Sequence, residues 1–418
     1  MSKTLMIKAM ALGAVACAFS ATGFAADVQN GHGQGIADST TEVNAAKHEA
    51  VRSNWMDRTD IVVGVGMKDS KETHSQHHYV GESSMRHDDL NTVTSKSSKS
   101  TEINKLYIET LQPITHYDEN AKSVVFVQGR IGRSGEKISS RALNNYWVPA
   151  RPAGTFITHD KQTDKKESLG MNANIGIGYR RLSKGEHAYV GVNAFYDHVF
   201  KGGYKRVSGG VEYVAGLNEF HANLYRNLGT DDRKYIGLRG RSNVLGDPAG
   251  LYPYGLDSNQ GLFNYGVVSY ENHWMLSEKV AASGFDVGYS RTFKNARWAR
   301  VYADYYNWRG REAVRVGYHK LKKRDAIKGF KVGAEFHITP HLTLDAGYQT
   351  ASHHLSGPYA TLKYTIGTSK FAWHGGKHSE NAITTARSKM LDKVHRSDMV
   401  VQEVEEETYD HGVVDVGL

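Results

Sequence analysis

Hydrophobic and polar side chains alternate along much of the chain between residues 61 and 366. In the segment NIGIGYRRL, residues 174–182, apolar side chains recur at every second position as Ile175, Ile177 and Tyr179. Successive side chains of a β-strand point to opposite faces, so a period of two predicts strands. The intervening residues are asparagine, glycine and arginine, which gives the predicted strand one apolar and one polar face.

The alternation predicts twelve strands and an all-β fold. The polar faces contain Arg300, Glu335 and Lys363, charges that lipid would reject at a cost of a few kcal/mol each. We therefore expect a transmembrane antiparallel up-and-down β-barrel whose apolar faces contact lipid and whose polar faces line a wet lumen. The predicted strands begin near Ile61, Lys105, Lys122, Met171, Glu186, Tyr204, Glu219, Lys279, Arg297, Lys328, His341 and Gly357.

Short and long connections follow the predicted strands in turn. In outer-membrane barrels the short turns are periplasmic and the long loops are extracellular, which gives this barrel an orientation. The short connections are 117–121, 182–187, 215–218, 294–297 and 339–341. The long ones are 68–103, 134–166, 229–278 and 309–327, with two shorter exceptions at 201–203 and 351–356.

Two alternatives to a twelve-stranded membrane barrel stay open. Residues 235–241 and 313–319 also alternate, so fourteen strands would fit, although we interpret both segments as β-structured extensions above the membrane. A soluble sandwich or lipocalin-like barrel would keep its polar face outward, and it would not need a chain this long or this regular.

Composition agrees with a membrane barrel. The 418 residues include 24 tyrosines, which suit a lipid–water boundary because the ring and the hydroxyl prefer different phases. Hydrophobic residues make up only 39%, so we expect no helical membrane span after the first 25 residues. The net charge of +8 comes from lysines and arginines without a basic helix or stripe, and we therefore expect no nucleic-acid partner.

The N-terminus resembles a secretory signal peptide, residues 1–25. Lys3 and Lys8 form its charged region, apolar residues follow, and Ala25 ends a small-residue cleavage motif. The only cysteine, Cys17, lies inside this segment, so the exported chain can form no disulfide. A lipoprotein signal at Cys17 is the alternative, but it lacks the usual leucine. We expect a cell outer membrane protein of a Gram-negative bacterium.

The segment GVNAFYDHVFKGGYKRVSGGVEY, residues 191–213, resembles the β-domain of the inverse autotransporters, the intimin and invasin family. His198 and Val199 replace part of the acidic stretch of the family motif. Residues 174–182 and 284–290 resemble two further strands of that family. The matching residues are Gly191, Asn193, Phe195, Asp197, Phe200, Gly203, Arg206, Gly210, Glu212 and Tyr213.

From the residues alone, Arg180, Asp197, Arg206 and Glu212 are expected to form a lumenal charge network. Glycines such as Gly191 and Gly210 permit close strand approach. We find no catalytic carboxylate pair and expect neither an enzyme nor a cofactor.

The family resemblance implies an outer-membrane anchor that exports a C-terminal segment to the cell surface for attachment. It also implies lipids, lipopolysaccharide, the barrel-assembly machinery and periplasmic chaperones as partners. A host or cell-surface ligand would bind through extracellular loops or through a passenger in trans, because the sequence ends at Leu418 without immunoglobulin-like repeats. The alternatives are an outer-membrane channel and a stand-alone binding protein that acts through its surface loops.

The predicted domains are the signal peptide (1–25), a periplasmic segment (26–58), the barrel (59–367) and a helix with a linker (368–418). Apolar residues recur at helical spacing after Ser379, and residues 390–407 resemble the family linker that threads the lumen. Residues 398–418 span at most about 70 Å when extended, against a hydrocarbon core of about 30 Å, so the tail can reach outside. A disordered periplasmic tail is the alternative. The helical spacing involves Ala382, Ile383, Ala386, Met390 and Val394.

Three polar clusters remain. For the cluster in the first long loop, a surface zinc site is one interpretation and a solvated loop is the one that we expect. The basic cluster in a later loop suits lipopolysaccharide phosphates, and the acidic run 403–407 is expected to be a solubilising tail. The first cluster comprises His74, His77, His78, Asp88 and Asp89, and the second comprises Lys320, Lys322, Lys323 and Arg324.

Overall fold

The computed structural model describes residues 54–80, 87–117, 120–150, 155–229, 232–236, 241–245, 265–310, 315–316, 319–320, 326–352, 356–367 and 386–417. Twelve antiparallel strands of this part of the chain form a closed barrel, because β19 pairs back with β1. In order around the wall they are β1 (Thr59–Val80), β2 (His87–Pro113), β3 (Ser123–Arg133), β6 (Met171–Leu182), β7 (Ala188–Val199), β8 (Lys205–Ala215), β9 (Asn218–Asn227), β13 (Gly284–Phe293), β14 (Ala296–Trp308), β17 (Ile327–His337), β18 (Leu342–Ala351) and β19 (Gly357–Thr365).

The barrel prediction is confirmed, and so is the choice of twelve strands over fourteen. The additional alternating segments lie outside the wall. Residues 232–236 and 241–245 pair with β12 (Tyr265–Ala281) as β10 (Asp232–Ile236) and β11 (Arg241–Leu245). Residues 315–316 and 319–320 form a separate two-stranded sheet, β15 (Arg315–Val316) with β16 (His319–Lys320).

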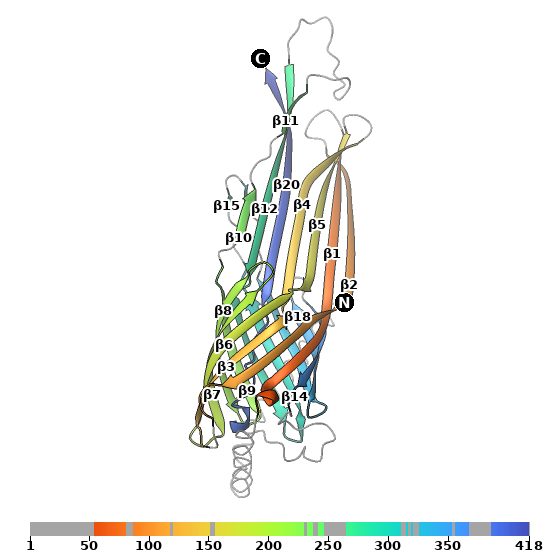
Figure 1. The fold of residues 1–418 in the computed structure, drawn as a ribbon. Coiled ribbons are helices and arrows are strands. Elements are labelled where there is room, and N and C mark those ends of the chain that lie inside the picture. Colours follow the sequence, from red (N-terminus) through yellow and green to blue (C-terminus); the bar gives the residue numbers. More distant parts are fainter. Residues whose placement is uncertain are drawn as a thin grey trace, which may run out of the picture.

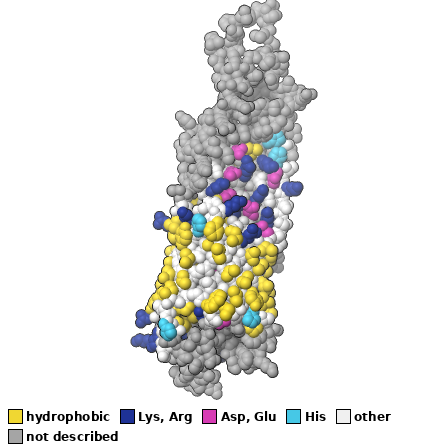
Figure 2. All heavy atoms as spheres, in the orientation of Figure 1, with side chains coloured by type: hydrophobic (Ala, Val, Ile, Leu, Met, Phe, Trp, Pro, Cys, Tyr) yellow, Lys and Arg dark blue, Asp and Glu magenta, His cyan; other side chains and the backbone are white. Residues whose placement is uncertain are grey.

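The barrel side chains face outward or inward as the alternation predicts. Along β7, for example, Val190 and Val192 are 57% and 53% exposed, whereas Asn193 and Asp197 are buried toward the lumen. Figure 2 shows apolar side chains gathered over the barrel and charged side chains above them. A strand of about 12 residues is about 40 Å long and, tilted by about 40°, spans about the 30 Å of a hydrocarbon core.

Above the barrel, long strands extend beyond its end as further paired sheet, here called the extension (Figure 1). It contains the outer parts of β1 and β2 and, in spatial order, β5, β4, β20 and β12, with β10 and β11 on the far edge of β12. The remaining bounds are β4 (Glu136–Ala150), β5 (Thr155–Ser168) and β20 (Val400–Gly417).

The prediction that residues 68–103 and 134–166 form loops was wrong over most of their length. They are paired strands, with β1 joined to β2 from Thr59↔Thr110 to Tyr79↔His87. Both faces of these strands carry serine, threonine and charged residues because both faces meet water above the membrane. A strand that is wet on both faces has no apolar period, which is why the alternation did not reveal it.

Two 3-10 helices lie at the opposite end of the barrel from the extension, η1 (Trp55–Arg58) and η2 (Arg387–Lys389). The carboxylate of Asp57 accepts from the backbone of Asn54, and the side chain of Asn54 accepts from Trp55 N, which caps η1. None of the described helices is long and apolar enough to cross a membrane. The predicted signal peptide and most of the predicted periplasmic segment fall on residues 1–53, outside the described residues.

Candidate functional site: a filled lumen

Residues 386–399, here called the lumenal segment, lie inside the barrel. Ala386, Met390 and Val394, three of the residues with predicted helical spacing, are buried in a cluster with side chains of the barrel wall. The wall contributes Leu111, Val124, Phe126, Leu182, Tyr189, Phe195 and Val214. The apolar period therefore marks a contact with the wall.

The predicted helix does not continue through the lumenal segment. Only Arg387–Lys389 is helical among its residues, and Ala382 and Ile383 lie outside the described residues. The reason is competition for the backbone. Arg180 Nη1 donates to the carbonyls of Met390 and Asp392 at 2.9 and 2.6 Å, in place of intrahelical N–H groups.

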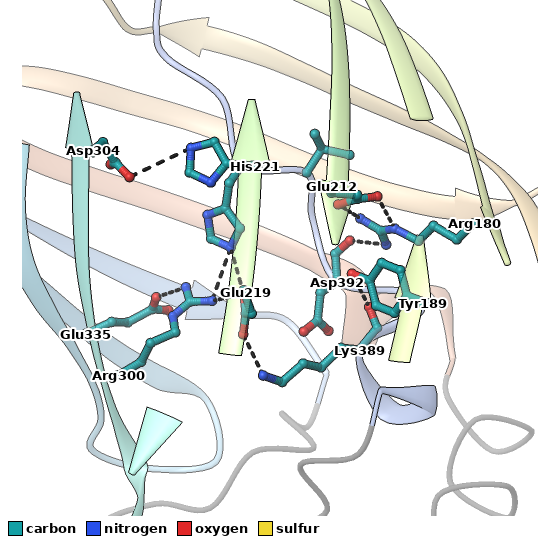
Figure 3. A network of polar contacts seen from close by, with 12 residues as sticks. Arg180, Tyr189, Glu212, Glu219, His221, Arg300, Asp304, Glu335, Lys389 and Asp392 are labelled. Carbon is teal, nitrogen blue, oxygen red and sulfur yellow. Dashed lines mark hydrogen bonds and ion pairs between the residues drawn. The ribbon is translucent and has the colours of Figure 1, made fainter. Parts of the chain in front are cut away.

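Arg180 is also the centre of a buried ion pair (Figure 3). Its Nε and Nη2 donate to the two carboxylate oxygens of Glu212 at 2.5 and 3.0 Å, and no part of its side chain is exposed. Its guanidinium carbon lies 4.5 Å from the ring centroid of Phe126. This bidentate pair comes from two wall strands, β6 and β8, and its spare donor holds the lumenal segment.

A second carboxylate, Asp197 on β7, lies between one arginine of the wall and one of the lumenal segment. Arg206 Nε donates to it at 2.9 Å, and Arg396 donates through both terminal nitrogens at 2.7 and 2.6 Å. Arg206 also donates to the carbonyl of Ser397 at 3.0 Å. Asp197 therefore links the wall, through Arg206, to the lumenal segment, through Arg396.

A third carboxylate, Glu219 on β9, accepts from Lys389 at 2.6 Å and from Arg300 at 3.1 Å. His395 lies 3.6 Å from the same carboxylate. Arg300 bonds in turn to Glu335, which Lys363 also contacts at 3.0 Å. The charges that we predicted on the polar strand faces thus form one chain of ion pairs across the lumen (Figure 3).

The two ends of the lumenal segment are fixed in the same way. At the end with the short turns, Arg387 donates to Glu186 at 2.7 and 2.9 Å and to the carbonyl of Ala121 at 2.8 Å. Toward the extension, Asp398 contacts Arg130 at 2.8 Å and Lys105 at 3.1 Å. Between them, Lys393 is paired with Asp60.

Glycines in the wall make room for these lumenal side chains. A Cβ on Gly191 would lie 2.3 Å from the carboxylate of Glu212, and one on Gly178 would lie 2.2 Å from the Phe126 ring. The motif glycine Gly210 similarly leaves room for Asn223, whose side chain would be 2.1 Å away. The glycines therefore leave space for the side chains that fill the lumen, in addition to permitting close approach of the strands.

The lumenal segment does not fill the whole barrel. A cavity of about 270 Å³ remains beside residues 393–400, against the wall formed by β1, β2, β14, β17, β18 and β19. Lys331 lies in it, 4.8 Å from the Tyr359 ring centroid and 5.1 Å from that of Tyr302. Charged side chains line part of it, among them Asp304, Glu335, Asp345 and Lys363.

The eight motif and lumen residues of the sequence analysis all come together around the lumenal segment. Arg180, Phe195, Asp197, Arg206 and Glu212 make the contacts above, and Gly191, Asn193 and Gly210 lie on the same inner face. Their functional role stays a prediction.

Sequence reasoning missed the partners on the lumenal segment itself. The signal was present, because five of the ten residues 387–396 are Lys, Arg or His and another is Asp. A tail that is to enter a lumen lined with carboxylates should carry such charges.

The other predicted clusters are only partly covered. His74 Nε2 lies 3.0 Å from His159 Nδ1 on the neighbouring strand, a hydrogen bond between two imidazoles. Among the described side chains no three His, Cys, Asp or Glu residues gather as metal ligands. The side chains of His77, His78, Asp88 and Asp89 lie outside the described ones, as do the side chain of Lys320 and residues 322–324.

A closed barrel with apolar side chains outside and a charged, filled lumen defines an outer-membrane β-barrel protein. The chain belongs to the inverse autotransporter β-domain family, whose model matches residues 157–398. The search of curated proteins finds no match.

Solved structures resemble the chain at low identity. A chain from work on the in-meso crystallization of membrane proteins is 13% identical with a TM-score of 0.43, over 83% of this chain and 100% of that one. The translocator domain of the autotransporter NalP from Neisseria meningitidis is 10% identical with a TM-score of 0.21, over 78% and 95%. The β-domain of the Bordetella autotransporter BrkA is 8% identical with a TM-score of 0.20, over 72% and 99%.

Proposed function

We propose that this barrel anchors the chain in the outer membrane and presents its C-terminal segment at the cell surface. The role is one of secretion and attachment, as in intimin and invasin, and no reaction is catalysed. One observation carries the proposal: the lumenal segment contacts the barrel from its short-turn end, at Glu186, to Arg130 of the wall strand β3, on the side of the extension. β20 then continues away from the barrel.

The orientation of the barrel supports this path. Short turns are typical of the periplasmic end and long connections of the extracellular end. The lumenal segment therefore begins at the periplasmic end and leaves at the outer one. Four of its cations, Arg387, Lys389, Lys393 and Arg396, each pair with a wall carboxylate, which would hold the segment in place after passage.

The test is the accessibility of two epitopes in intact cells. One epitope follows Leu418 and the other lies within residues 26–58, the predicted periplasmic segment. We expect antibody or added protease to reach the first in intact cells, and the second only after the outer membrane is permeabilised. A C-terminal epitope that stays protected until permeabilisation contradicts export.

The cavity beside the lumenal segment favours a second function, a narrow channel for small solutes. Its lining includes Arg300, Lys331, Glu335 and Lys363, all of them charged. Planar-bilayer recordings distinguish the two functions. A channel conducts with the lumenal segment in place, whereas a secretion barrel filled by its own segment has negligible conductance.

A further inference from the structure

The acidic run of β20 is held by basic side chains of the extension, and is more than the solubilising tail that its composition suggests. Glu407 accepts a hydrogen bond from Arg141 at 2.9 Å, and Glu405 lies 4.0 Å from the same guanidinium. Lys279 lies 3.9 Å from Glu405 on the other side. The base of the strand is held as well, because Glu403 lies 3.7 Å from Lys137 and accepts from the Tyr204 hydroxyl at 2.6 Å.

The main chain of β20 is paired along both edges. On one side it is parallel to β4 from Val400↔Glu136 to Thr408↔Asn144. On the other side it is antiparallel to β12 from Ala281↔Val401 to Tyr265↔Gly417. Arg141 and Glu407 are 266 residues apart in the chain, and a parallel pair cannot be made by a hairpin.

β20 therefore occupies a slot between two strands that do not pair with each other in the described structure. With β20 absent, the facing edges of β4 and β12 would present unpaired N–H and C=O groups. Main-chain bonds would accept any extended peptide there, whereas side-chain charges can select one. The flanking cations Lys137, Arg141 and Lys279 match an acidic strand in one register.

We propose that the slot between β4 and β12 is a docking site for an acidic strand, and that β20 occupies it after export. Docking retains the exported segment outside, because the paired strand cannot slide back through the lumen without breaking its bonds to both neighbours. This inference rests on the proposed function, since β20 must first reach the outer side.

Cysteine pairs test the docking in cells that make the full chain. A Cys17→Ser background carries no other cysteine. Two cysteine pairs are placed at consecutive register partners of β12 and β20: Trp274→Cys with Thr408→Cys, and His273→Cys with Tyr409→Cys. Because hydrogen-bonded and non-hydrogen-bonded pairs alternate along an antiparallel ladder, one of the two has the closer, non-hydrogen-bonded geometry. We expect at least one disulfide, and none for Trp274→Cys with Val413→Cys, which is five residues out of register. If neither in-register pair forms a disulfide, the proposal is overturned.

Charge reversal tests selectivity. Lys137→Glu with Arg141→Glu should lower the initial rate of disulfide formation about fivefold, given the modest worth of each exposed ion pair. Adding Glu403→Lys with Glu407→Lys should restore it. Lys96→Glu with Lys99→Glu is the matched control, because it makes the same charge change on exposed residues of β2, which does not pair with β20. Equal rates in all four proteins overturn the charge selection.

Two controls separate the possible failures. Heat-modified migration on gels checks that each variant barrel is folded. A membrane-impermeant maleimide applied to intact cells reports on Thr408→Cys alone. If this cysteine reacts only after lysis, export has failed. If it reacts in intact cells as fast as with β20 denatured, export has occurred and docking is wrong.

Discussion

Single residues in the lumen carry charges that are buried and yet paired. Arg180 and Arg206 have no more than 1% of their side chains exposed, and each faces a carboxylate of the neighbouring or next strand. An unpaired buried charge would be strongly destabilising. The main effect of removing one partner is therefore that the other charge stays buried without a partner. Glycine at Gly191 makes this possible by leaving space for Glu212.

Arg180→Met is expected to destabilise the barrel by about 3–5 kcal/mol, because Glu212 is left buried without its partner. Arg180→Met with Glu212→Met should recover most of that loss. Arg181→Met, at the exposed neighbouring residue, should change stability by less than about 0.5 kcal/mol. Denaturant unfolding in lipid vesicles measures all three. A double variant as unstable as the single one contradicts the pairing argument.

At the scale of whole strands, the same backbone serves two environments. β2 contacts lipid near Ile108, which is 49% exposed, but farther up it carries Val93 among serines, threonines and lysines, 63% exposed to water. Alternation predicts the first part because lipid demands one apolar face. It could not predict the second part, where pairing with β1 and not side-chain patterning decides that the chain is a strand.

The same substitution should therefore have different effects at two valines. Val192→Lys places a charge on the outward face at the middle of β7 and is expected to destabilise the barrel by about 2–4 kcal/mol. Val93→Lys in the extension should change the unfolding free energy by less than about 0.5 kcal/mol. Unfolding titrations in vesicles measure both. Equal effects would mean that the lipid boundary is misplaced.

The extension should also weaken in acid. The hydrogen bond from Lys137, at 2.6 Å, holds the pKa of Glu167 below its ordinary 4.5 in spite of partial desolvation. Burial alone would lower the pKa of Lys137, but the bond to Glu167 raises it above 10.5. The stabilisation is therefore fully present between about pH 4.5 and 10.5, and is lost as the pH falls below or rises above that window.

Glu167→Gln should cost about 0.2–1 kcal/mol of unfolding free energy at pH 7, the range of solvent-screened pairs, and less at pH 3, where the carboxylate begins to take up its proton. The measurement is the difference in unfolding free energy between the variant and wild type at each pH. A difference as large at pH 3 as at pH 7 contradicts this assignment.

At the scale of the whole molecule, the alternation of apolar and polar residues accounts for the barrel wall. It does not account for the lumenal segment. The lumenal segment forms ion pairs with carboxylates of β1, β7, β9 and the turn before β7. These groups are more than 150 residues from it in the chain. Their charges can be found in the sequence, but their partners cannot.

Deleting residues 378–418 should open the lumen. We expect conductance in planar bilayers to rise at least about tenfold over the full chain, because a twelve-stranded barrel is wider than its own wall side chains can fill. Deleting only residues 409–418 leaves the lumenal segment in place and should leave conductance unchanged. Equal, negligible conductance from all three would mean that the wall side chains close the lumen by themselves.

By itself, the sequence determined the barrel, the face that each wall strand turns to lipid and the lumenal position of Arg180 and Asp197, and it favoured twelve strands over fourteen. These follow from local alternation, because each strand meets lipid on one side and water on the other. Only the tertiary structure decided that Asp197 has two arginines, that residues 390–399 are not helical, and that the acidic strand lies between β4 and β12. Those features depend on contacts between residues far apart in the chain, which no local period encodes.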